Sequence, residues 1–236
     1  MKWAADCWVV IPAAGVGRRF GASVPKQYLD LAGRPVIEYA VSLFLDHPRI
    51  LGVALALEPG DAYWGRLALS GHPAIMRADG GAERCHSVLS ALDVLSSRAG
   101  EDDWVLVHDA ARPCLRRTDL DRLLDALADH PAGGLLGIPV RDTMKEARGD
   151  NGVLRTVARE RLWHAFTPQM FPFALLRRAL REALAGGRLV TDDAAAVELM
   201  GLSPLLVKGH ADNIKITQPE DLPLARFFLE QQGRLC

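Results

Sequence analysis

Near its start the chain has an apolar run, residues 7–11, that leads directly into a glycine-rich loop carrying basic residues. Such a run is typical of a buried strand. Backbone N–H groups at a turn after a strand form a ready site for an anion. Around Gly15, the residues Arg18, Arg19 and Lys26 would add three positive charges, which suits a triphosphate better than a single pyrophosphate. We therefore expect an α/β fold with a phosphate-binding loop after its first strand.

Two familiar phosphate motifs do not match this loop. In a dinucleotide-binding fingerprint the third glycine would fall at Phe20, whereas the chain has it at Gly21. The Gly-Lys-Ser/Thr ending of a Walker loop does not follow at the required interval either. From the loop alone, a turn with solvated arginines remains an alternative to phosphate binding.

The composition is that of an ordinary globular protein. Its 236 residues fit one α/β domain, which we expect to span residues 1–236. A formal net charge of −1 does not favour a nucleic-acid-binding protein, and no apolar run is long enough for a membrane span. Asp6 interrupts the apolar N-terminus, which favours a core strand over a signal peptide. The four cysteines lack metal-ligand spacing and are typical of reduced thiols, so we expect a cytoplasmic protein.

Strand and helix patterns alternate along the chain. Apolar stretches predict strands at residues 50–57, 104–107, 135–140, 205–207 and 214–217. Helical spacing predicts helices at residues 36–45, 87–95, 172–184 and 192–200, another one capped by Thr118, and a last one from Pro219. This alternation predicts a single Rossmann-like domain with a mainly parallel sheet and helices on both faces.

Residues 141–159 break the alternation. They contain a strong hairpin turn, Gly-Asp-Asn-Gly at residues 149–152, between two polar segments. A two-stranded hairpin is barely stable alone in water. We therefore expect a protruding β-arm, inserted within the domain, that packs on a second subunit of a homodimer.

Polar residues follow the predicted strands, and in open α/β sheets ligands bind beyond the carboxyl ends of the strands. The loop at residues 12–26 and residues 108–113 and 141–143 come directly after predicted strands. A glycine turn at 79–84 precedes the helix at Ser87, residues 167–169 follow the polar hairpin, and residue 215 lies near the final strand. We expect them to meet at one edge of the sheet. Taken alone, Asp109 after its strand is as compatible with a solvated acid as with a ligand site. The alternating pattern around Lys215 by itself favours a lysine that faces solvent.

Eight stretches of the chain together resemble the 2-C-methyl-D-erythritol 4-phosphate cytidylyltransferase family. They are PAAGVGRRF, PKQYLDLAGRPVIEYAV, DGGAERCHSV, WVLVHDAARPCL, PVRDTMK, LWHAFTPQMF, TDDAAAVE and ADNIKITQPEDL. The resemblance runs from residue 12 to residue 222. The set is specific in combination, although no single stretch is.

This resemblance implies an enzyme that transfers CMP from CTP to 2-C-methyl-D-erythritol 4-phosphate, with Mg²⁺ as cofactor. The implied catalytic residues are Arg19, Lys26 and Lys215. The implied nucleotide-binding residues are Pro12, Ala13, Ala14, Gly15, Gly17, Arg18, Gly81, Ser87, Asp109 and Ala110. The implied residues of the polyol phosphate site are Arg112, Thr143, Thr167 and Arg159, the last from the neighbouring subunit. Asp109 is also the implied ligand of Mg²⁺.

The residue types suit that chemistry, because phosphoryl-group transfer depends on positioning and charge more than on covalent work by the protein. A single carboxylate suffices for a magnesium ion that the phosphates also hold. A ribitol 5-phosphate cytidylyltransferase, another sugar-phosphate nucleotidyltransferase and an inactive nucleotide-binding module remain alternatives. Ala82 and Ala195 depart from the family's pattern and receive no role.

Overall fold

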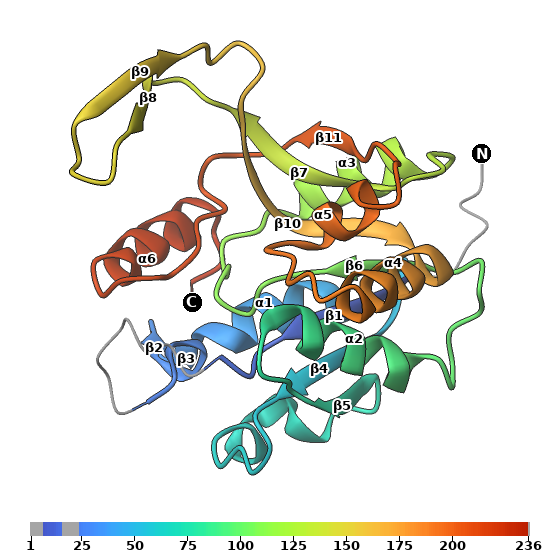
Figure 1. Cartoon of the computed structure of the whole chain (residues 1–236). Helices are drawn as coiled ribbons and strands as arrows, with labels where there is room; N and C mark the ends of the chain where they lie inside the picture. Colours follow the sequence, from blue (N-terminus) through green and yellow to red (C-terminus); the bar gives the residue numbers. More distant parts are fainter. Residues whose placement is uncertain (1–6, 16–23, 236) are drawn as a thin grey trace.

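The computed structural model describes residues 7–15 and 24–235 and is built on a seven-stranded sheet with the order β11-β7-β10-β6-β1-β4-β5 (Figure 1). The strands are β1 (Cys7–Pro12), β4 (Ile50–Leu57), β5 (Ile75–Asp79), β6 (Trp104–Val107), β7 (Gly134–Pro139), β10 (Trp163–Pro172) and β11 (Leu205–Lys208). β10 runs antiparallel to its neighbours β6 and β7, and the other pairs of the sheet are parallel. The prediction of a mainly parallel sheet is confirmed.

Helices cover both faces of this sheet (Figure 1). They are α1 (Val36–Leu45), α2 (Arg84–Leu95), α3 (Arg117–Leu127), α4 (Phe173–Ala185), α5 (Asp193–Glu198) and α6 (Asp221–Gln231). Short 3₁₀ turns are η2 (Lys26–Tyr28), η3 (Trp64–Arg66) and η4 (Ala68–Gly71), and a small separate ladder joins β2 (Asp30–Leu31) to β3 (Arg34–Pro35). None of the helices in the described part of the chain could cross a membrane.

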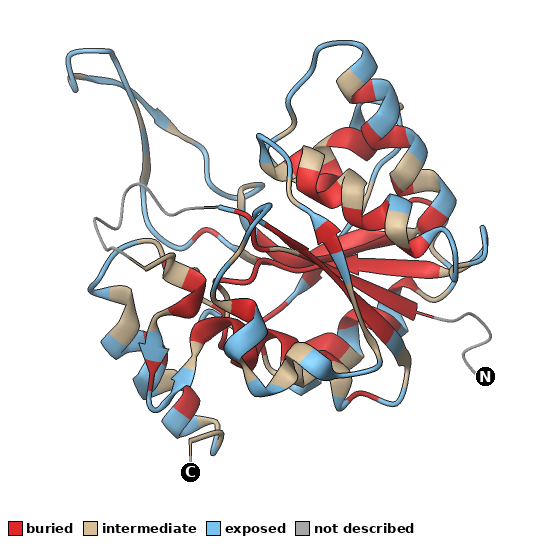
Figure 2. Ribbon diagram, turned by 90° about the horizontal axis from the view of Figure 1, so that it is seen from below, coloured by how far each residue is buried: buried red, intermediate tan, exposed pale blue. Residues whose placement is uncertain are grey.

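Alternate residues of β1 belong to two different cores. Val9 and Ile11 pack with α1 and α3 on one face, whereas Trp8 and Val10 pack with α2, α4 and α5 on the other. Successive side chains of a strand point to opposite faces, so a strand buried on both faces is apolar throughout. The apolar run at the start of the chain forms such a strand, with its residues buried at the centre of the molecule (Figure 2).

A third core cluster lies beside the sheet, where α6 packs. Ala225 and Leu229 of α6 are fully buried against Ile216, Cys114 and residues of α1. Asp221, the first residue of α6, accepts hydrogen bonds from the backbone of Thr217 at 2.7 Å and of Gln218 at 2.9 Å. The C-terminal helix therefore holds residues 214–218 against the loop that follows β6.

The arm consists of β8 (Met144–Ala147) and β9 (Val153–Val157), which pair antiparallel and project from the sheet (Figure 1). Asn151 adopts a left-handed conformation, with φ of 64°, within the predicted turn. The arm extends the β7–β10 pair, since the N–H of Val140 donates to the carbonyl of Leu162 at 2.9 Å at its base. β10 is antiparallel because it is the return strand of this long hairpin. The arm is largely exposed (Figure 2).

Some local predictions were wrong. Residues 214–217 do not form a strand; instead the N–H of Ile216 donates to the carbonyl of Ala111 at 2.8 Å in an irregular segment. Thr118 does not cap its helix, which begins at Arg117 after Arg116. β5 and β10 were not predicted as strands. β10 contains Pro168 at a shift of register, and a proline within a sheet is confined to such irregular or edge positions.

Candidate functional site

A cavity of about 1010 Å³ opens at the carboxyl ends of β1, β4, β5 and β6. This is the edge at which open α/β sheets bind ligands. Many of the residues singled out from the sequence line it: Pro12, Ala13, Ala14, Gly15, Lys26, Gly81, Ser87, Asp109, Ala110 and Lys215. Segments that are far apart in the sequence therefore meet here, as expected.

The other predicted site residues have different places. Arg112 and Thr167 lie directly behind Asp109, to which both are linked by polar contacts. Thr143 and Arg159 are exposed at the base of the arm, where the Arg159 guanidinium donates to the carbonyl of Arg141. Three further residues, Gly17, Arg18 and Arg19, lie outside the described residues.

Two glycines allow close approaches after β5, one to the loop after β1 and one to α2. A Cβ added at Gly80 would lie 2.0 Å from the Cβ of Ala14, and one at Gly81 would lie 2.3 Å from the Cβ of His86. The N–H of Gly81 donates to Ser87 Oγ at 3.0 Å, which joins this turn to the first turn of α2. The two glycine loops thus form one continuous wall of the cavity.

Lys26 reaches the cavity from the short turn η2. The neighbouring Gln27 is buried, and its Nε2 donates to the carbonyl of Ala13 at 2.7 Å. Lys26 Nζ donates to the carbonyl of Ile216 at 3.1 Å. These bonds attach η2 both to the end of β1 and to the segment that carries Lys215. The backbone positions of Lys26 and Lys215 are therefore fixed relative to each other.

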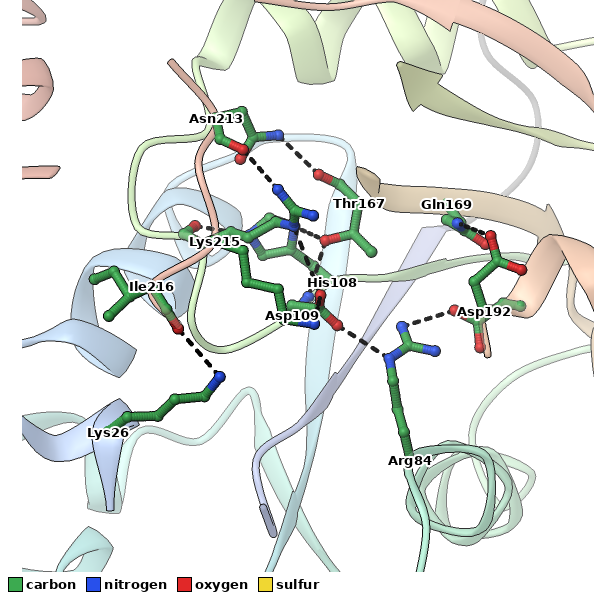
Figure 3. A network of polar contacts seen from close by, with 12 residues as sticks. Lys26, Arg84, His108, Asp109, Thr167, Gln169, Asp192, Asn213, Lys215 and Ile216 are labelled. Atoms are coloured by element: carbon green, nitrogen blue, oxygen red, sulfur yellow. Dashed lines mark hydrogen bonds and ion pairs between the residues drawn. The ribbon is translucent and has the colours of Figure 1, made fainter. Parts of the chain in front are cut away.

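Asp109 is the centre of a cluster of cations (Figure 3). Its Oδ1 lies 3.0 Å from Arg84 Nε, while its Oδ2 lies 2.8 Å from Lys215 Nζ and 3.6 Å from Arg112 Nε. Burial by itself would raise the pKa of the Asp109 carboxyl, but these three cations hold it well below its usual range. Arg84 also pairs with Asp193, so the three cations face two carboxylates and the cluster keeps one net positive charge, which suits a polyanionic ligand.

A buried hydrogen-bond chain fixes the backbone of Asp109. Its N–H donates to Thr167 Oγ1 at 3.0 Å, and Thr167 Oγ1 lies 3.0 Å from His108 Nδ1. His108 Nε2 lies 3.0 Å from the carbonyl of Arg112, which can only accept, so Nε2 carries the proton and Nδ1 accepts from the threonine hydroxyl. Burial lowers the pKa of His108 to about 4, so the imidazole is neutral at physiological pH.

Arg112 joins three segments behind the cavity. Its Nη1 donates to the carbonyl of Asn213 at 2.7 Å, and Asn213 Nδ2 donates to the carbonyl of Thr167 at 2.8 Å. Its guanidinium lies 5.6 Å from the ring centre of Phe166. The loop after β6, the middle of β10 and residues 212–217 thus hold one another in place.

Sequence reasoning missed Arg84, Gln27 and the partner of Asp193. Arg84 lines the cavity and links Asp109 to Asp193 Oδ2, 2.9 Å from its Nη2. A basic residue directly after a glycine turn was a usable signal for Arg84. For Asp193 there was none, because an acid at the start of a predicted helix is typical of a helix cap. Asp192 does cap α5, accepting from the N–H of Ala195 at 3.0 Å.

The donor set bears on whether a metal ion fits. Among the described residues, no group of three or more His, Cys, Asp or Glu side chains could hold a metal. Asp109 can still serve as a single ligand, because a carboxylate offers about four lone-pair sites and its contacts leave one or more of them open. Mg²⁺ is often bound by one or two carboxylates together with phosphates. The residues therefore fit a magnesium ion that arrives with a phosphate ligand.

A mainly parallel sheet whose carboxyl edge gathers glycine loops and clustered cations is the architecture of a nucleotide-binding α/β protein. Comparison with known protein families narrows this class of protein to one family. The family model for 2-C-methyl-D-erythritol 4-phosphate cytidylyltransferase, IspD, matches residues 7–231, and the chain belongs to this family.

Similar proteins extend over nearly the whole chain. The cytidylyltransferase of that name from Ectopseudomonas mendocina is 56% identical over 220 residues, covering 93% of this chain and 94% of its own. The one from Vibrio parahaemolyticus is 52% identical over 223 residues, covering 94% and 95%. The crystal structure of the Francisella tularensis enzyme matches with a TM-score of 0.84 at 34% identity, covering 95% of this chain and 100% of that one.

Proposed function

We propose that this chain transfers CMP from CTP to 2-C-methyl-D-erythritol 4-phosphate, giving 4-diphosphocytidyl-2-C-methyl-D-erythritol and pyrophosphate. The observation that carries the proposal is the cation cluster around Asp109, set beside two glycine loops in a chain that matches the family over residues 7–231. The reaction joins two polyanions, and this site supplies the positive charge that such an encounter requires.

In the proposed reaction, a phosphate oxygen of the acceptor attacks the α-phosphorus of CTP. A new P–O bond forms, the bond from the α-phosphorus to the bridging oxygen breaks, and pyrophosphate leaves with the electron pair. The attacking phosphate monoester is largely ionised at neutral pH, so no general base is required. Most of the catalytic work is therefore positioning and stabilisation of the developing charge.

We assign the cations of the cavity to the two phosphates. Lys26, whose neighbour Gln27 is bound to the loop after β1, would act at the α-phosphate together with Arg19, which lies outside the described residues. Lys215, bound to Asp109, would hold the acceptor phosphate. Lysine suits this task because it is a movable point charge that can exchange a carboxylate for a phosphate. Gly81 and Ser87 would meet the cytosine and its ribose.

The remaining assignments concern the polyol and the metal. Arg112, Thr143 and Thr167 would contact the acceptor, with Thr167 keeping one lone pair free beyond its two bonds to Asp109 and His108. Mg²⁺, when bound, supplies neutralisation of the triphosphate charge. Asp109 would be its protein ligand.

We further propose a homodimer in the cytoplasm. The arm is exposed and projects from its own domain, and Arg159 at its base would reach the acceptor phosphate of the neighbouring subunit. The three described cysteines, Cys7, Cys85 and Cys114, are buried free thiols, which suits a reducing compartment.

A substrate matrix tests the proposal. CTP, UTP, ATP and GTP are each incubated with 2-C-methyl-D-erythritol 4-phosphate or ribitol 5-phosphate, with pyrophosphate release and product mass as readouts. We expect CTP with methylerythritol phosphate to exceed every other combination in kcat/KM by about 10²-fold or more. Preference for ribitol 5-phosphate, or for another nucleotide, would contradict the proposal and identify the alternative enzyme.

A further inference from the structure

Arg84 has no part in the reaction as described, yet it lies within the cation cluster. It is the first residue of α2, directly after the glycine turn of the cavity wall. Its Nε donates to Asp109 Oδ1 at 3.0 Å (Figure 3). Its Nη2 donates to Asp193 Oδ2 at 2.9 Å. A planar guanidinium can hold two carboxylates from different elements in one fixed arrangement.

The second carboxylate, Asp193, is firmly anchored. It is the first residue of α5, and this end of the helix is attached to β10 through Gln169. Gln169 Oε1 accepts from the N–H of Ala194 at 2.8 Å, and its Nε2 donates to Asp192 Oδ2 at 2.9 Å. A continuous series of contacts therefore runs from β10 through α5 to Arg84, and from there to Asp109.

Asp193 also needs an explanation of its own. Asp193 is fully buried, and burial raises the pKa of its carboxyl. Its Oδ1 has no hydrogen-bond partner among the described residues. The helix cap does not require it, because Asp192 already fills that role. A buried carboxylate is costly unless it is paired, and its ion pair is with Arg84.

We propose that Arg84, anchored by Asp193, is a positioning residue of this enzyme. Arg84 on Oδ1 and Lys215 on Oδ2 hold the Asp109 carboxylate from two sides. Without Arg84 the carboxylate turns toward Lys215 and Arg112 and binds them more fully. Lys215 is then less available to the acceptor phosphate. The expected loss of kcat rests on the proposed function. The expected rotation of the Asp109 carboxylate does not depend on the substrate.

The kinetic test uses Arg84→Gln, Arg84→Lys and Asp193→Asn. We expect Arg84→Gln to lower kcat by about 10²-fold, the size of loss that misplacement by about 1 Å produces, while the KM for CTP changes little. Arg84→Lys should recover part of the loss, since it restores a cation. Asp193→Asn should lower kcat by less than Arg84→Gln does.

The double variant Arg84→Gln/Asp193→Asn separates positioning from stability. Removing Arg84 alone leaves Asp193 as an unpaired buried charge, so Arg84→Gln should also lower the Tm. Removing that charge as well should restore much of the Tm but none of the kcat, because Asp193 acts only through Arg84. Recovery of kcat together with Tm would show a merely structural ion pair and overturn the proposal.

A matched control lies on the same helix. Asp93 pairs with Arg177 and Arg181 of α4 at 2.8 Å each, on the surface, and Asp93→Asn should leave kcat unchanged. A crystal structure of Arg84→Gln gives the readout that does not depend on activity: we expect the Asp109 carboxylate to be rotated toward Lys215. An unmoved Asp109 would overturn the inference, whereas a wild-type enzyme inactive in the substrate matrix would overturn the proposed function instead.

Discussion

The charged side chains of the cavity edge and those of the arm lie in opposite environments. At the edge, Asp109 is nearly buried and is met by Arg84 and Lys215 of the same chain. In the arm, Arg155 pairs with Glu146 on an exposed surface, where an ion pair contributes little to stability. The edge is therefore organised by the fold of one chain, whereas the arm presents polar groups outward. In the proposed homodimer, the preorganised half of the site would be completed by the arm of a second copy.

The largest expected effect tests the preorganised half. Lys26→Ala should reduce kcat by about 10³-fold, because the charge it removes acts where the transition state differs most from the ground state. The KM for CTP should change far less. Arg19→Ala should behave in the same way.

Lys208→Ala is the control for these variants, since Lys208 is an exposed lysine at the end of β11. Its activity should match the wild type. A Lys26→Ala enzyme that keeps its kcat and only raises the KM for CTP would show that Lys26 binds the ground state alone.

The next prediction tests whether the arm completes a neighbour's site. Arg159→Ala and Asp109→Ala homodimers should each lose about 10²-fold or more in activity. Refolding the two variants together in equal amounts should restore about a quarter of the wild-type activity, since half of the dimers are mixed and each mixed dimer has one intact site. Activity of the mixture, with subunit exchange followed by native mass spectrometry, is the measurement. If the subunits exchange but the activity does not recover, Arg159 belongs to its own chain's site or lies outside any site.

A smaller effect concerns the metal at the preorganised edge. Chelation should abolish turnover and added Mg²⁺ should restore it. Asp109→Asn should need a Mg²⁺ concentration about tenfold higher for half-maximal rate, because it lacks the charge of a carboxylate ligand. Titration of activity against free Mg²⁺ measures the shift, and superimposable titrations for variant and wild type would assign the metal to other ligands.

The smallest effect concerns stability at the edge. Burial lowers the pKa of His108 to about 4 from its ordinary 6.5. As the pH falls between these values, the unfolded chain binds a proton that the native imidazole does not, so the native state loses about 3 kcal/mol of stability. Above pH 6.5 this contribution is fully present.

Urea unfolding of the wild type and of His108→Gln at pH 7 and pH 4.5 measures it. The variant should lose less stability than the wild type across this interval. His72→Gln, which removes an exposed histidine, should follow the wild type. Parallel losses in wild type and His108→Gln would show that the buried ring does not cause the pH dependence.

Sequence patterns predicted the structure correctly where residues of a single strand or turn determine it. The apolar residues of β1 and the Gly-Asp-Asn-Gly turn of the arm were predicted correctly. Residues 214–217 alternate as a strand would, but the N–H of Ile216 bonds to the carbonyl of Ala111, which is distant in sequence. β10 was obscured because Pro168 interrupts it.

The same limit applies to the site. Residues that follow a predicted strand, such as Gly15 and Asp109, could be placed at the cavity edge because the topology of parallel strands determines that position. The pairing of Arg84 with Asp193 depends on how α5 docks on β10, and the two residues are separated by 109 positions. No spacing rule relates them, so only the folded structure reveals the contact.

In the seven-stranded sheet, the antiparallel strand β10 links the arm to the site. β10 leaves the base of the arm and enters the sheet between β6 and β7 (Figure 1). It carries Thr167, whose Oγ1 accepts from the N–H of Asp109. The covalent backbone of this strand thus connects the arm to Thr167, which holds Asp109. In the proposed homodimer, a second copy bound to the arm would act on this strand, and assembly would thereby be coupled to the alignment of the reacting groups.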